Sequence, residues 1–368
     1  MRFGAMDHPD GDRKLHPRAT PLWGGLSVLC ALVLGVVLVE PSLLFTDGAA
    51  HLMPSALVLL AAAGICLFGA VDDVWPIRSR PKLLLQVFVL SLVVGLGFRV
   101  EQVNLLNHTI SLGWLAYPIT LFWLLGCVNA FNLLDGSDGL VTTVAMVASG
   151  LIAVVASVMG HHDVALLAAA MVGATAGFLV HNRPTARIFL GDSGSMLIGL
   201  VVGMLSLKAA IVPDKGLVVV FPIVLICLPL LDSVLALLRR LLSGKSFDTP
   251  DREHIHHRLG DRGFGAWRVL ITLSVLFTVT GAAATIAFLT GYRAIGWMAA
   301  ITTVVWMVRA QWFGHHEWEM AARTVHRWTR RAGSTIGKHM VRHIAVHKKD
   351  GTEEDKKKKP PASRRKAA

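Results

Sequence analysis

Ten long apolar segments, separated by short polar ones, dominate this sequence. They cover approximately residues 22–45, 52–71, 82–98, 117–134, 139–159, 164–180, 195–211, 217–238, 269–289 and 294–312. A helix needs roughly 20 predominantly apolar residues to cross a bilayer. Only 16% of the residues are charged, against roughly a quarter in soluble domains. We therefore expect an all-α integral membrane protein, a polytopic bundle of about ten transmembrane helices that forms one domain over residues 22–314.

The basic residues are distributed unequally between the two predicted sides of the membrane. Ten spans place both termini on one side, and 32 of the 36 Lys and Arg residues lie in the loops of that side or in the C-terminal tail. Cytoplasmic loops carry such an excess, so we expect residues 1–21 and the tail, residues 315–368, to be cytoplasmic. The tail predicts a basic amphipathic helix followed by disorder, which contacts anionic lipids. The net charge of +12 does not lead us to expect nucleic-acid binding, because the basic residues lie in these loops and in the tail.

Four polar segments, all on the predicted cytoplasmic side, contain candidate functional residues. In the first, Asp72 and Asp73 end one predicted span, and Lys82 begins the next. Ionisable groups at a membrane boundary are costly and usually functional. Adjacent carboxylates bind a divalent cation or share a proton. The alternative is a solvated helix end followed by a basic cluster that only sets topology.

The second segment has the sequence N-A-F-N-L-L-D-G-S-D-G-L. Asn132, Asp135 and Asp138 recur in it at a spacing of three, beside two glycines. Carboxylate and amide oxygens suit a hydrated Mg²⁺ or the polar edges of a nucleotide. The alternative is an Asx-turn that merely connects two spans.

The third segment, N-R-P-T-A-R-I-F-L-G-D-S-G-S, contains Asp192 between glycines at a predicted helix N-terminus. Such a terminus, with a carboxylate and with Arg183 and Arg187 nearby, predicts an anion and metal site. The alternative is simple capping of the helix by Asp192 or Ser193.

The fourth segment, D-T-P-D-R-E-H-I-H-H-R-L, gathers His254, His256, His257 and Arg258. These side chains bind metals, hold phosphates or move protons. Because a zinc site usually has cysteines or histidines at helical spacing, phosphate binding is the preferred interpretation. A basic loop that rests on lipid headgroups is the alternative.

Taken together and in order, these motifs resemble those of the polyprenyl-phosphate N-acetylhexosamine-1-phosphate transferases. The resemblance begins with D-H-P-D-G-D-R-K-L-H-P-R-A-T-P-L-W-G-G near the N-terminus and extends to about Trp312. The H-I-H-H-R-L loop is typical of the branch that uses UDP-N-acetylglucosamine-type sugars. Family members commonly carry one more span before the first motif.

The resemblance implies a reaction, a set of substrates and a role for each candidate residue. A UDP-N-acetylhexosamine and polyprenyl (undecaprenyl) phosphate would give polyprenyl diphosphate-sugar and UMP, as the first membrane step of O-antigen, teichoic acid or similar polysaccharide assembly. Mg²⁺, or Mn²⁺, would offset the repulsion between the two anions. The implied roles are lipid-phosphate positioning or deprotonation by Asp72 and Asp73, phosphate binding by Lys82, metal binding by Asp192 with Asn132 or Asp135, nucleotide or metal contact by Asn132, Asp135 and Asp138, and diphosphate binding by His254, His256, His257 and Arg258.

The location implied is the bacterial plasma membrane, with the active site on the cytoplasmic side, and a homodimer is common in the family. Two alternatives stay open. One is the phospho-N-acetylmuramoyl-pentapeptide transferase branch, which the form of the histidine loop disfavours. The other is a transporter or a non-catalytic scaffold; the one-sided polarity disfavours transport, and the intact aspartates disfavour a scaffold.

Overall fold

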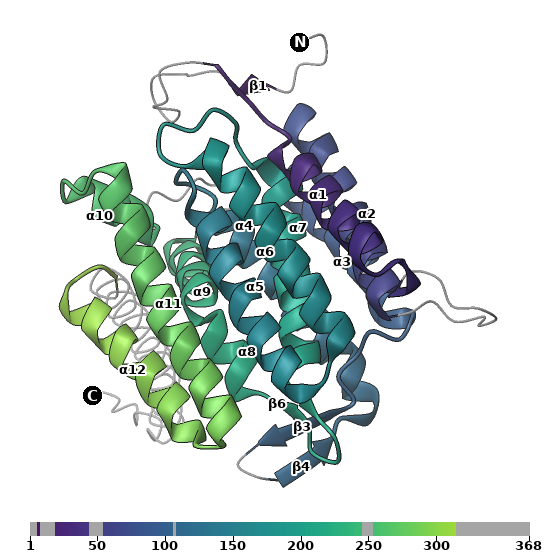
Figure 1. Cartoon of the computed structure of the whole chain (residues 1–368). Helices are drawn as coiled ribbons and strands as arrows, with labels where there is room; N and C mark the ends of the chain where they lie inside the picture. The colour runs from purple at the N-terminus through teal and green to yellow at the C-terminus, as the bar shows by residue number, and fades with distance from the viewer. Residues whose placement is uncertain (1–5, 8–18, 44–53, 106–107, 245–252, 314–368) are drawn as a thin grey trace, which may run out of the picture. The chain divides into compact units, whose positions relative to one another are not determined.

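The computed structural model describes residues 6–7, 19–43, 54–105, 108–244 and 253–313, most of which are helical (Figure 1). The helices are α1 (Gly24–Val39), α2 (Pro54–Val74), α3 (Ser79–Gly95), α4 (Ala116–Leu134), α5 (Leu140–Met159), α6 (His162–Asn182), α7 (Gly191–Ala209), α8 (Val220–Leu225), α9 (Cys227–Ser243), α10 (Ile255–Asp261), α11 (Ala266–Thr290) and α12 (Arg293–Arg309), with short 3₁₀ turns at Pro41–Leu43 and Gly113–Leu115. The expected cytoplasmic tail, residues 315–368, lies outside the described residues, as does most of the N-terminal segment.

Six helices of the described part are long and apolar enough to cross a membrane. They are α2, α4, α5, α6, α7 and α11, and the shorter α1 is apolar as well. The prediction of a mostly helical polytopic membrane protein is therefore confirmed. The figure of ten spans stays a prediction.

The predicted span over residues 217–238 is wrong as a single helix. The chain forms α8, breaks at Ile226 and then forms α9. Pro229 lies at the third position of α9, and a proline ring clashes with the carbonyl four residues earlier while offering no N–H to it. The helix therefore cannot continue through this point without a break.

Two small sheets lie at opposite ends of the helix bundle, although an all-α chain was expected. Strands β1 (Met6–Asp7) and β2 (Thr20–Pro21) pair antiparallel at one end. At the other end lies a four-stranded sheet in the order β4-β3-β6-β5 (Figure 1), made of β3 (Gln102–Leu105), β4 (His108–Ser111), β5 (Ile211–Val212) and β6 (Gly216–Val218). The strands fall in loops too short to show an alternating pattern, which is the sequence signal for a strand.

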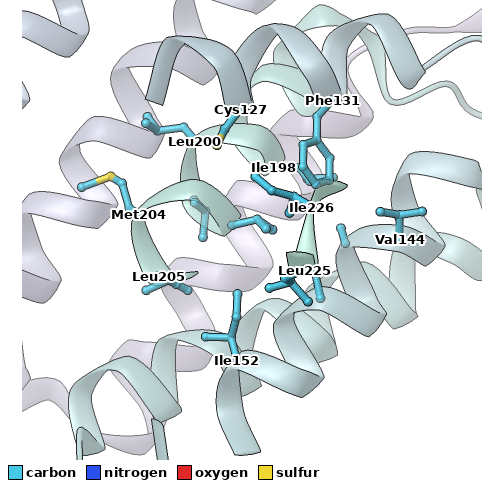
Figure 2. Packing of buried hydrophobic residues seen from close by; sticks show 14 of the residues in the cluster. Cys127, Phe131, Val144, Ile152, Ile198, Leu200, Met204, Leu205, Leu225 and Ile226 are labelled. Carbon is cyan, nitrogen blue, oxygen red and sulfur yellow. The ribbon is translucent and has the colours of Figure 1, made fainter. Parts of the chain in front are cut away.

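Helix α7 lies at the centre of the bundle and is almost completely buried. It packs against α1, α2, α4 and α5, and Figure 2 shows its side chains Ile198, Leu200, Met204 and Leu205 among residues of α4, α5 and α8. Its glycines allow close approach: a Cβ atom at Gly199 would lie 2.6 Å from the carbonyl oxygen of Cys127. Small residues provide such contacts between membrane helices.

We expect Gly25→Ala to destabilise the protein because α1 crosses the start of α7 at this position. An added Cβ would lie 2.2 Å from the backbone nitrogen of Gly194, and backbone cannot move aside cheaply. Overpacking of this kind costs about 1–3 kcal/mol, so thermal unfolding in detergent should begin several degrees lower. Gly177→Ala on α6 is the matched control, since no atom lies within 4 Å of its added Cβ. Equal melting temperatures for the two variants would contradict the prediction.

Candidate active site

Lys82 joins carboxylates from two other helices. Its Nζ lies 2.7 Å from Asp72 Oδ2, at the end of α2, and 2.7 Å from Asp192 Oδ2, at the start of α7. The Asp72 side chain is only 4% exposed, and its Oδ1 accepts a hydrogen bond from the Ile77 N–H at 2.6 Å. Three of the residues singled out in the sequence thus form one ion-pair cluster, in which Asp72 is buried and Lys82 and Asp192 are partly exposed.

Asp73 points to a different partner from Asp72. Its carboxylate accepts hydrogen bonds from the backbone N–H groups of Asp192, at 2.7 Å, and Ser193, at 3.2 Å. The alternative considered for this segment, in which Asp192 or Ser193 caps α7, is wrong, because Asp73 caps the helix from α2. Gly191 has φ +72°, and a Cβ there would lie 2.6 Å from Asp73 Oδ2, so glycine is required for the carboxylate to reach the helix end. A carboxylate there also interacts favourably with the helix dipole.

Asn132 and Asp135 lie at the C-terminal end of α4, beside the same cluster. Asn132 Nδ2 donates to Asp192 Oδ1 and, at 3.0 Å, to Ser195 Oγ. Within the described part of the chain, the Asp135 carboxylate has neither a hydrogen bond nor an ion pair. Burial, together with the charges of Asp192, Asp73 and Asp138, raises the pKa of Asp135 well above its usual value. An unpartnered carboxylate in negative surroundings is a natural position for a cation.

Asp138 has a structural contact in this arrangement. Its Oδ2 accepts the Ala186 N–H at 3.0 Å. Asn182 connects the same two loops: its Oδ1 accepts from the Gly139 N–H at 3.1 Å and from Thr142 Oγ1 at 2.8 Å. The second and third polar segments are thereby held side by side.

A cavity of about 1300 Å³ opens beside these groups, at the end of the bundle that carries β1, β2 and α10. The described residues around it include Asp73, Asn132, Asp135, Asp138, Asp192 and His257. Among the described residues, no group of three or more His, Cys, Asp or Glu side chains is arranged to hold a metal ion.

The histidine segment, which we define as residues 254–258, reaches this site only in part. His257 lines the cavity. His254 Nδ1 lies 2.8 Å from Asp232 Oδ2 on α9, and Arg258 pairs with Glu253 at 2.6 Å. His256 is 5% exposed and has no hydrogen-bond partner among the described residues on either ring nitrogen. Burial and the neighbouring His257 lower the pKa of His256 to about 3, so its ring is neutral at physiological pH.

Comparison with known proteins agrees with this geometry. A protein-family model described as glycosyl transferase family 4 matches residues 55–210. This range runs from the first turn of α2 to the end of α7 and contains most of the site. A Bacillus subtilis protein named "Probable undecaprenyl-phosphate N-acetylglucosaminyl 1-phosphate transferase" is 33% identical over 261 residues, covering 70% of each chain. The decaprenyl-phosphate N-acetylglucosaminephosphotransferase of Mycolicibacterium smegmatis is 32% identical, covering 83% of this chain and 81% of its own.

The chain belongs to the polyprenyl-phosphate N-acetylhexosamine-1-phosphate transferase family.

The pentapeptide branch of this transferase family is also similar. The phospho-N-acetylmuramoyl-pentapeptide-transferase of Geobacillus kaustophilus is 29% identical over 76% of this chain and 89% of its own. Its identity is lower than that of the two N-acetylglucosamine enzymes.

Two residues at the edge of the site escaped the sequence analysis of this transferase. Asn182 connects two loops, and only its place at the start of a polar segment hinted at a role. Asp232 had a clearer signal, because it is a lone carboxylate within the predicted span 217–238. An ionisable residue within a membrane span is a functional candidate by default.

Proposed function

We propose that this transferase moves N-acetylglucosamine-1-phosphate from UDP-N-acetylglucosamine to polyprenyl phosphate, with release of UMP. The names of the N-acetylglucosamine relatives support this donor and acceptor. The observation that carries the proposal is the convergence of Lys82, Asp192, Asn132 and Asp135 beside one large cavity. The expected product, a polyprenyl diphosphate-sugar, would start a cell-surface polysaccharide.

The site residues fit a divalent cation. Asp135 offers a carboxylate that has no partner among the described residues and lies in the electrostatic surroundings of Asp192. The amide of Asn132 adds an oxygen, and Mg²⁺ prefers such oxygen ligands. We propose that Asp192 and Asp135, with Asn132, hold Mg²⁺, and that Mn²⁺ can replace it. When bound, the ion would neutralise charge on the diphosphate and on the departing UMP.

The side chains contribute positioning and charge. Polyprenyl phosphate attacks the sugar-linked phosphorus. Lys82 lies between Asp72 and Asp192, and its ammonium group can hold a phosphate there. A phosphate monoester has its second pKa near 6 and is largely dianionic at neutral pH. Deprotonation by Asp72 or Asp73 is therefore unnecessary, and we propose that Asp72 orients Lys82 while Asp73 orients the start of α7. His257, at the cavity wall, is the member of the histidine segment best placed to contact the UDP diphosphate.

We further propose that the chain crosses the bacterial plasma membrane ten times over residues 22–314, with the site, residues 1–21 and the basic tail 315–368 in the cytoplasm. The excess of basic residues on this side supports the orientation. The tail would bind anionic lipids. We also propose that the protein forms a homodimer, as is common in the family.

The first test is UMP release by the purified, detergent-solubilised protein. We expect UMP only when undecaprenyl phosphate, Mg²⁺ and UDP-N-acetylglucosamine are all present. Turnover with UDP-N-acetylmuramoyl-pentapeptide instead would support the second branch of the family. A well-folded sample that releases no UMP with any UDP-aminosugar would refute the transferase function and favour a scaffold.

A further inference from the structure

We infer that Asp232 is a positioning residue of the reaction, which orients the histidine segment through His254; this rests on the proposed function. Asp232 lies on α9 and is 8% exposed. Its Oδ2 lies 2.8 Å from His254 Nδ1, and its Oδ1 accepts the Ile255 N–H at 3.2 Å. One carboxylate therefore holds both a histidine ring and the backbone at the start of α10.

The surroundings of Asp232 make these two contacts necessary. The carboxylate borders a small cavity whose other described lining residues are apolar, among them Leu134, Leu140 and Phe277. Burying a carboxylate in apolar surroundings is costly unless its oxygens accept hydrogen bonds. In the described part of the chain, the donors come from the histidine segment, so the segment and α9 are tied together.

The effect of Asp232 reaches the large cavity through the three histidines. The rings of His254 and His256 are nearly parallel, with centroids 5.8 Å apart, and the rings of His256 and His257 lie 4.2 Å apart. His256 also packs against Gly136, in the loop between α4 and α5, where an added Cβ would lie 2.2 Å from His256 Nε2. His257, the last of the three, lines the cavity. Asp232 thus acts on the cavity wall without touching it.

The carboxylate also selects the tautomer of His254. A carboxylate oxygen accepts hydrogen bonds, so the ring nitrogen that faces it, His254 Nδ1, carries the proton of this hydrogen bond. Asparagine has the same shape but offers one acceptor and one donor group. In Asp232→Asn, either the Ile255 N–H or the His254 Nδ1–H would therefore face an NH₂ group, and the ring would have to change tautomer or turn.

The test compares steady-state kinetics of Asp232→Asn and wild type in the UMP-release assay. Losing one partner of a buried hydrogen bond should lower kcat/KM for the UDP-sugar by about 10- to 100-fold, mainly through a higher KM, with the KM for polyprenyl phosphate unchanged. Ser233→Ala is the control, because Ser233 is the next residue on α9 and its buried Oγ has no hydrogen-bond partner among the described residues. Kinetic constants of Asp232→Asn equal to those of Ser233→Ala would overturn the inference.

A double-mutant cycle tests the route through His254. If Asp232 acts through this ring, Asp232→Asn should change KM little in a His254→Gln background, whereas full additivity would overturn the route. Should Asp232→Asn fail to fold, His254→Gln alone decides: a raised KM for the UDP-sugar supports the inference, and an unchanged one overturns it. A wild-type protein that releases no UMP would instead refute the proposed function, so the two failures are distinguishable.

Discussion

Asp192→Asn is expected to lower UMP release by about 10²- to 10³-fold or more, since removing one electrostatic contact to a reacting group has effects of this size. Asp192 is the residue on which Lys82 and Asn132 both converge. Asparagine keeps its size but removes the charge that a divalent cation and Lys82 need. The measurement is UMP release across a Mg²⁺ titration, with thermal unfolding to verify the fold.

The control for this charge removal is Asp163→Asn, in the first turn of α6. This residue lies at the opposite end of the bundle, where His161 Nε2 lies 2.9 Å from the backbone oxygen of Ile211 in the four-stranded sheet. The control should keep wild-type turnover. Near-normal activity of Asp192→Asn at every Mg²⁺ concentration would refute the role of Asp192 in cation binding.

Lys82→Met should reduce both stability and turnover. The change leaves Asp72, with a side chain only 4% exposed, and Asp192 without their shared cation. Removing one partner of a buried ion pair costs up to about 3–5 kcal/mol; the exposure of Asp192 places the expected loss toward the lower end. Thermal unfolding in detergent should therefore shift down by several degrees, and UMP release should be lost.

A double variant separates the structural from the catalytic role of Lys82. Lys82→Met with Asp72→Asn removes one charge of each sign and should recover part of the stability, but no turnover, if Lys82 also holds phosphate. Recovery of UMP release in the double variant would show that Lys82 serves only to neutralise Asp72. Unchanged unfolding of the single variant would contradict the ion-pair cluster itself.

Much of the site was predictable because its polar residues stand next to apolar segments in the sequence. The residues that stood out as polar groups at the ends of apolar segments are Asp72, Asp73, Asn132, Asp135, Asp138 and Asp192. The structure places the last five around one cavity and links Asp72 to Asp192 through Lys82. The specific partners were not predictable. Lys82 and Asp192 are 110 residues apart in sequence, and no local pattern says that a lysine at the start of α3 meets a carboxylate at the start of α7.

The histidine segment illustrates the same limit. Its composition predicted phosphate binding by four side chains, yet only His257 lines the cavity, while Arg258 pairs with Glu253 and His254 with Asp232. Helix α10 is only seven residues long. Which of its faces meets the cavity depends on how α9 and α11 pack against it. Sequence spacing does not contain that orientation.

The sequence by itself determined the class of protein, the apolar helices and the family chemistry. These features are local, because an apolar segment of about twenty residues is enough to cross a bilayer. The carboxylates at the ends of such segments are likewise visible in the sequence. Only the tertiary structure decided that Asp73, rather than Asp192 or Ser193, caps α7, that the span at 217–238 breaks at Ile226, and that Asp135 is left without a partner among the described residues. Each of these depends on which distant backbone and side-chain groups meet once helices pack, and packing selects those partners by shape and by the need to satisfy every buried polar group.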